Sequence, residues 1–88
     1  MTVNAVRIHP ADNVACLLCD LGAGDRAEMG QGEGPELATA IRTGHKVALA
    51  AIARGAAVVK YGQPIGAATT DIAPGDHVHL HNLKGATQ

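Results

Sequence analysis

The sequence feature that most constrains the fold is a short motif, Ile/Leu-x-x-Gly-x-x-Val/Ala, that occurs four times. In each copy the glycine can form a turn with positive φ, and the preceding Ile or Leu can anchor that turn in a core. An alternating strand can begin directly after the turn. The pattern therefore predicts short β-strands separated by glycine turns. The copies span residues 21–27, 41–47, 52–58 and 72–78.

The spacing of the copies predicts that the chain consists of two related halves. The glycines of the first and third copies are 31 residues apart, and so are those of the second and fourth. A repeat of this length indicates a duplicated unit, and we expect internal pseudo-twofold symmetry. Alternation in the strands after the second and fourth turns predicts core positions at Val47, Leu49, Val78 and Leu80.

The segments around the motif copies also favour strands. Residues 3–8 and 14–18 read as two strands joined through a turn at 10–13, which predicts a hairpin. Alanine and leucine favour helix, and we expect at most short helical turns near 36–41 and 50–54. The predicted fold class is a mainly β small domain.

Length and composition predict one domain, residues 1–88, with a thin core. Hydrophobic residues make up 47% of the chain, but Phe and Trp are absent and there is one Tyr. A chain this short buries about 60–65% of its unfolded surface, and small aliphatic side chains contribute less than aromatic ones. We therefore expect a partner surface or a homo-oligomer.

Charge and hydropathy exclude two classes of partner. The net charge is -1, and the 17% of charged residues form no runs, which argues against nucleic acid and anionic lipid. The chain has no stretch of about 20 apolar residues and no signal-peptide pattern at its N-terminus. We expect a cytoplasmic protein that does not bind membranes.

Two motifs that suggest chemistry are better explained structurally. The glycines of residues 30–35 match neither the dinucleotide fingerprint nor the P-loop, and we expect a mobile surface loop. Cys16 and Cys19 have C-x-x-C spacing, but residues i and i+3 of a strand face opposite sides. We expect buried structural thiols there.

Three histidines near the C-terminus give the clearest chemical signal. His77, His79 and His81 alternate with Val78 and Leu80, so a strand would place all three imidazoles on one face. Neighbouring imidazoles would lie about 6.6–6.8 Å apart by backbone rise, and two could converge on a transition metal or an anion. The pair His79 and His81 is the candidate metal site. The alternative is a solvated strand face.

Two further polar pairs are candidates for anion binding. His45 and Lys46 follow the second glycine turn and could present an imidazole and an ammonium to a carboxylate. Lys60 and Tyr61 follow another predicted strand and could bind an anion or donate a hydrogen bond. Either pair could instead be ordinary surface, with Tyr61 covering the edge of the core. The residues around His9, including Asp12 and Asn13, have the composition of a structural turn.

Several short motifs together resemble a known family, the SAF domain of the altronate and galactarate dehydratases. The resemblance covers nearly the whole chain. It rests on Ile8-His9-Pro10, Asp12-Asn13-Val14, Gly44-His45-Lys46, Val59-Lys60-Tyr61-Gly62, Ile65-Gly66 and His79-Leu80-His81-Asn82.

The resemblance implies a β-clip fold and a lyase component. In this family the SAF domain either precedes a long catalytic chain or forms a separate small subunit, and the end of this chain soon after Asn82 resembles the separate form. The implied reaction is β-elimination from a hydroxy acid such as a sugar acid. A large catalytic subunit would hold most of the machinery, including a divalent metal, Fe2+ in the family.

By motif, the resemblance carries over a set of residues that would face the substrate or the partner's active site. The alternative is a non-catalytic SAF binding module or an assembly scaffold. The set comprises His45, Lys46, Lys60, Tyr61, His79, His81 and Asn82.

Overall fold

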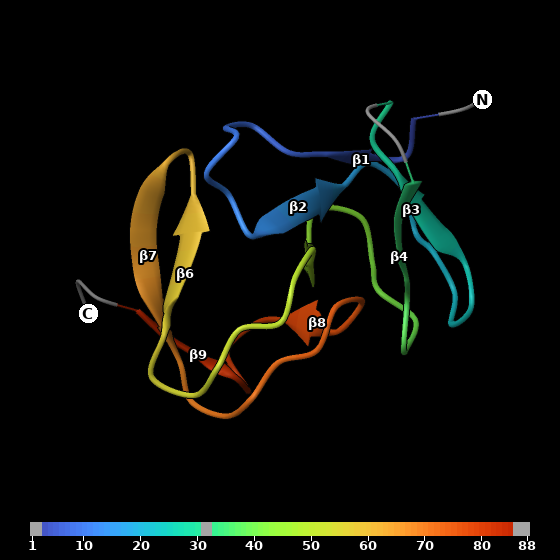
Figure 1. The fold of residues 1–88 in the computed structure, drawn as a ribbon. Helices are drawn as coiled ribbons and strands as arrows, with labels where there is room; N and C mark the ends of the chain where they lie inside the picture. The colour runs from blue at the N-terminus through green and yellow to red at the C-terminus, as the bar shows by residue number, and fades with distance from the viewer. Residues whose placement is uncertain (1–2, 31–32, 86–88) are drawn as a thin grey trace.

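The computed structural model describes residues 3–30 and 33–85, and within these ranges it contains nine strands and no helix (Figure 1). The prediction of a mainly β domain is confirmed. The strands are β1 Ala5–Val6, β2 Val14–Leu17, β3 Arg26–Glu28, β4 Glu33–Glu36, β5 Lys46–Ala48, β6 Ala57–Lys60, β7 Gln63–Ala68, β8 His77–Val78 and β9 Leu83–Gly85.

The strands form one central sheet and two flanking units, all antiparallel. The central sheet has the order β1-β2-β5-β8. The hairpin β3–β4 lies to one side of it in Figure 1, and the sheet β6-β7-β9 lies to the other. The expected N-terminal hairpin is present as β1 and β2, although both strands are shorter than predicted.

The duplication predicted from the glycine spacing appears in the backbone hydrogen bonds. The bridge between Leu21 and Ile41 recurs 31 residues later between Ile52 and Ile72. The hairpins β3–β4 and β6–β7 share the same offset, and both have a register shift after the first pairs. Strands β5 and β8 also begin 31 residues apart. The two halves are therefore built from one backbone plan.

The sequence allowed at most short helical turns near 36–41 and 50–54, and neither segment contains helix. Ile41 and Ile52 make β-bridges instead, each with the equivalent residue of a neighbouring turn. The amide of Gly44 donates to the carbonyl of Leu17 at 2.8 Å, and the amide of Gly75 donates to Ala48 at 2.8 Å. These non-local bonds outweigh the helix propensity of the alanine-rich segments.

The core is divided into two aliphatic clusters on opposite faces of the central sheet. Successive residues of a strand point to opposite faces, so Val47 joins one cluster and Ala48 the other. Val47 and Val78 are fully buried, as predicted, and Leu49 packs against the first cluster. Leu80 is 82% exposed, so its assignment to the core is wrong. Strand β8 ends at Val78, and Leu80 lies in the turn that follows.

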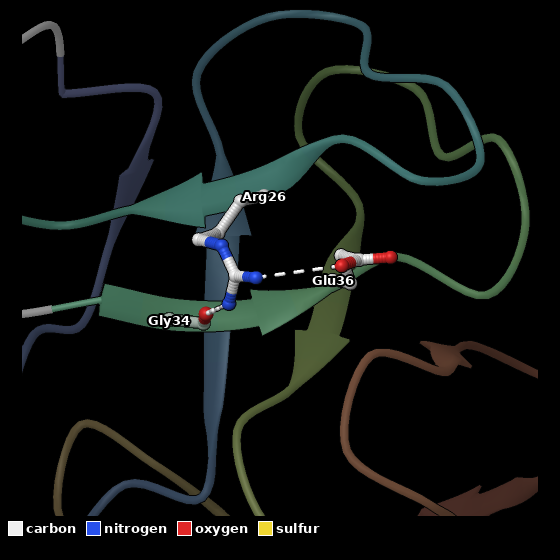
Figure 2. Close-up of polar contacts among 3 residues, drawn as sticks. All are labelled: Arg26, Gly34 and Glu36. Atoms are coloured by element: carbon white, nitrogen blue, oxygen red, sulfur yellow. Dashed lines mark hydrogen bonds and ion pairs between the residues drawn. The ribbon is translucent and has the colours of Figure 1, made fainter.

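Two other structural expectations need correction. Residues 33–35 of the predicted mobile loop belong to strand β4, whereas residues 31–32 lie outside the described ranges. Figure 2 shows how Arg26 of β3 joins this strand: its guanidinium donates to the carbonyl of Gly34 at 2.9 Å and lies 3.4 Å from the Glu36 carboxylate. Cys16 is half-buried but Cys19 is exposed, so only one thiol approaches the predicted burial.

No helix in the described ranges could span a membrane.

The fourth glycine turn is the most tightly packed of the four. Gly75 has φ 90°, and a Cβ there would overlap the carbonyl oxygen of Glu36. Its own carbonyl accepts a hydrogen bond from Ala38 at 3.1 Å. Gly44 has φ 82°, but a Cβ there would meet no atom within 4 Å beyond its chain neighbours. The two glycines thus differ in packing and not in backbone conformation.

We expect Gly75→Ala to destabilise the protein much more than Gly44→Ala. Gly44→Ala adds only the strain of a positive φ, about 1–2 kcal/mol. Gly75→Ala adds a backbone overlap to the same strain and should lower the free energy of unfolding by about 3 kcal/mol or more. Urea denaturation followed by circular dichroism measures both variants. Equal losses would contradict the packing at Gly75.

Candidate functional site

The pairing of β5 with β8 brings three of the predicted histidines together. The register places Val47 opposite His77, and two residues further along the same register His45 lies opposite His79. Directly opposed residues of an antiparallel pair project on the same face and lie in contact distance. The imidazoles of His45, His77 and His79 therefore meet at the end of the central sheet. We call them the histidine cluster.

Short distances connect the three rings. Nδ1 of His45 lies 2.8 Å from Nε2 of His77, a hydrogen bond in which the tautomers decide the donor. The ring centroids of His45 and His79 are 4.6 Å apart, and those of His77 and His79 are 5.5 Å apart and nearly parallel. Each residue offers one ring nitrogen such that all three nitrogens lie within 4.8 Å of one another. All three side chains are half-buried.

The expected strand continuing to His81 is replaced by a turn. Asn82 is 5% exposed, and its Oδ1 accepts the amide of His79 at 2.9 Å while its Nδ2 donates to the carbonyl of His77 at 2.8 Å. The side chain of Asn82 thus holds the backbone of two cluster residues. The turn brings His81 against His77, with ring centroids 5.3 Å apart. The structure therefore groups His79 with His45 and His77, and links His81 to His77.

Burial and neighbouring basic groups favour the neutral forms of His77 and His79 by lowering their pKa values. Burial is the largest cause that lowers the pKa of His77 below its usual 6.5, followed by His45, His81, His79 and Lys46. Burial also comes first among the causes that lower the pKa of His79. Both imidazoles are consequently unprotonated near pH 7, the form that accepts a proton or a metal ion.

Lys46 projects on the opposite face of the sheet from His45. The two residues are neighbours in the chain, and alternation separates their side chains. Lys46 lies opposite Cys16 of β2 and is half-buried. The predicted imidazole and ammonium pair is therefore divided between two faces, although the charge of Lys46 still contributes to the lowered pKa values of His77 and His79.

Lys60 and Tyr61 form a second group at the turn between β6 and β7. Nζ of Lys60 lies 4.8 Å from the centroid of the Tyr61 ring, a cation–π distance. Tyr61 is 58% exposed and has φ 57°, which is uncommon for a residue with a side chain. Burial is the largest influence on Lys60 and lowers its pKa, but contacts with Cys16 and Tyr61 raise the pKa overall.

Asp12 holds this turn in place. Its carboxylate is 4% exposed and accepts backbone amides from His9 at 3.1 Å, Tyr61 at 3.1 Å and Gly62 at 2.8 Å. Burial raises the pKa of Asp12, but the amide donors together lower it by more than burial raises it. The pKa of Asp12 therefore lies below its usual 3.8. The structural role expected for the first turn therefore extends to a candidate site residue 49 positions away.

Sequence reasoning did not identify the roles of His77 and Asp12 in organising these groups. The alternation of histidines indicated a shared face, but it did not indicate that His45 would lie among them. The 31-residue repeat contained that signal, because it aligns the strand after Gly44 with the strand after Gly75. The contact between Lys60 and Cys16 had no local signal.

Comparison with known proteins identifies the class to which this fold and its polar residues belong. Residues 3–86 match the altronate/galactarate dehydratase SAF domain. The chain belongs to this family.

Individual relatives agree with the family. The chain is 47% identical to altronate dehydratase of Escherichia coli over 79 residues, which are 90% of this chain and 16% of that protein. It is 43% identical to altronate dehydratase of Bacillus subtilis over the same length. It is also 50% identical to the (2R)-sulfolactate sulfo-lyase subunit alpha of Paracoccus pantotrophus over 44 residues, which are 50% of this chain and 66% of that subunit. The chain thus spans about a sixth of the dehydratases that it matches.

We expect the pKa of His77 to lie below 6.5 in the folded protein and to rise in the His45→Gln variant, which removes a neighbouring imidazole. The unfolded chain then binds more protons than the native state between pH 6.5 and the folded pKa. The contribution of His77 to the free energy of unfolding should be complete above pH 6.5 and should be lost as the pH drops through this window. NMR titration of the imidazole and denaturation at several pH values measure the two effects. A His77 pKa at or above 6.5 would contradict the burial of the cluster.

Proposed function

We propose that the chain is the SAF component of a hydroxy-acid lyase and that it works with a large catalytic subunit. The favoured lyase is a sugar-acid dehydratase such as altronate dehydratase. The family membership and 47% identity over 90% of the chain support this. The similarity to a protein named as a sulfo-lyase subunit alpha supports a division between subunits. Substrates are sought among sugar acids and sulfonated hydroxy acids.

The observation that carries the proposal is the histidine cluster at the end of the central sheet. β-Elimination requires a base to remove the proton next to the carboxylate, groups that stabilise the resulting enediolate, and an acid to assist the departing hydroxide. Neutral imidazoles can accept protons and hydrogen bonds from hydroxyl groups. The cluster would then form one wall of the active site, with His81 beside it in the turn that follows β8.

The remaining predicted residues fit less directly into this wall. Asn82 makes its hydrogen bonds to the backbone of His77 and His79, so it would position the histidines without touching substrate. Lys60 and Tyr61 present an ammonium and a phenol at a separate turn, where they would contact the large subunit or the acid end of a long substrate.

The lyase is proposed to use a divalent metal that the large subunit mainly holds. Fe2+ is the favoured ion. Such an ion would neutralise the developing negative charge of the enediolate. Imidazole is a ligand that suits Fe2+, so the residues of this chain fit a metal beside the substrate.

The test is to co-express the chain with its large subunit and to assay the complex on altronate, galactarate and sulfolactate. We expect turnover only when both chains are present. The double variant His79→Ala and His81→Ala should assemble normally and reduce kcat by about 100-fold or more, the usual scale of a lost acid or base. Arg54→Ala, an exposed position in the third glycine turn, serves as the matched control.

Two outcomes would reject the proposal. Full turnover by the complex that carries the double histidine variant would show that the chain is a binding module or scaffold. Turnover by the 88-residue chain alone would overturn the division of labour.

A further inference from the structure

We propose that His45, His77 and His79 bind one divalent transition-metal ion on this chain itself, with a coordination position left open. This inference goes beyond the proposed function, which places the metal of the lyase mainly on the large subunit. It also does not depend on that function, because the three ligands belong to one chain and lie together without a partner.

The distances between the ring nitrogens suit such an ion. Metal–nitrogen bonds of 2.0–2.1 Å in a tetrahedral site place ligand nitrogens about 3.3 Å apart. Nδ1 of His45 lies 2.8 Å from Nε2 of His77, and one ring nitrogen from each of the three residues lies within 4.8 Å of the others. Small side-chain rotations would lengthen the distance between the His45 and His77 nitrogens and shorten the distances from each of them to the His79 nitrogen. The hydrogen bond between His45 and His77 would be exchanged for two bonds to the metal.

The backbone of the cluster is held in a way that favours a site of fixed geometry. His77 belongs to β8, and His45 directly precedes its paired strand β5, where the carbonyl of His45 accepts the amide of Leu17 at 3.0 Å. The amide of His79 is bound by the nearly buried side chain of Asn82. Ligands on paired strands with locked backbone hold a metal more precisely than ligands on free loops. Most of the conformational entropy needed to order the ligands is therefore already lost when the chain folds.

The number and burial of the ligands indicate a metal site of the catalytic type. Three imidazoles leave the fourth position of a tetrahedral ion for water or a substrate oxygen, the arrangement of catalytic sites. The side chains are half-buried, so solvent reaches the cluster. Imidazole donors suit Zn2+, Fe2+, Ni2+ and Cu2+ better than Mg2+ or Ca2+. A carboxylate or hydroxyl oxygen is the expected ligand for the open position.

His81 distinguishes the histidine cluster from the metal site predicted from sequence, which consists of His79 and His81. Its ring contacts His77, but it does not belong to the group of nitrogens that lie within 4.8 Å of one another. A site formed by His79 and His81 requires both of these residues. A site formed by the histidine cluster requires His45 and tolerates loss of His81. Single variants therefore distinguish the two.

The experiment titrates the purified 88-residue chain with Zn2+ by calorimetry and with Co2+ by visible absorption. We expect one ion per chain. His45→Ala, His77→Ala and His79→Ala should each weaken binding by at least about 10-fold, the lower limit found when even supporting residues of metal sites are changed. His81→Ala and His9→Ala should stay within about 3-fold of the wild type, because His9 lies in a separate turn.

Circular dichroism of each variant establishes that it folds, and the glutamine variant at the same position replaces any alanine variant that does not. NMR of the wild-type chain gives a readout that needs no variant, because Zn2+ should shift the imidazole signals of the cluster and leave those of His9 unchanged. Absence of binding, or equal weakening by His9→Ala, would overturn the inference. A chain that binds metal but supports no lyase activity would reject the proposed function alone.

Discussion

The antiparallel pairing of β5 with β8 is the interaction on which the candidate site depends. Each strand is only two or three residues long, so few hydrogen bonds determine its register. A shift of one residue would move every side chain to the other face of the sheet. Val47 and Val78 would then leave the two core clusters, and the histidines would separate. The free energy of core burial thus maintains the arrangement of the polar groups.

The glycine turns and the fold class could be predicted because their signals are local. A glycine between an anchoring isoleucine and an alternating segment specifies a turn and a strand without reference to the rest of the chain. The end of β8 could not be predicted in the same way. Alternation from His77 to His81 favours a continuing strand, and the competing turn depends on how one asparagine side chain bonds the backbone. The bridge made by Ile41 could not be predicted for a similar reason, since its partner Leu21 is distant in sequence.

Asp12 and Asn82 are used in the same way in two parts of the chain. Each side chain accepts the amide of a histidine three residues earlier, His9 in one case and His79 in the other. Asp12 carries a charge and reaches two further amides, whereas Asn82 donates its own amide to a carbonyl. The amide side chain suits a turn beside imidazoles because it adds no charge that would stabilise their protonated forms.

The absence of Phe and Trp has a consequence for spectroscopy. Tyr61 is the sole aromatic ring besides the imidazoles, it is 58% exposed, and it lies in the turn that Asp12 holds. Its ultraviolet absorption and fluorescence therefore report on that turn and on the approach of Lys60, and hardly at all on the aliphatic interior. A loss of tyrosine signal on heating or acidification would mark local opening near Asp12. The interior can melt at a different point without changing the tyrosine signal.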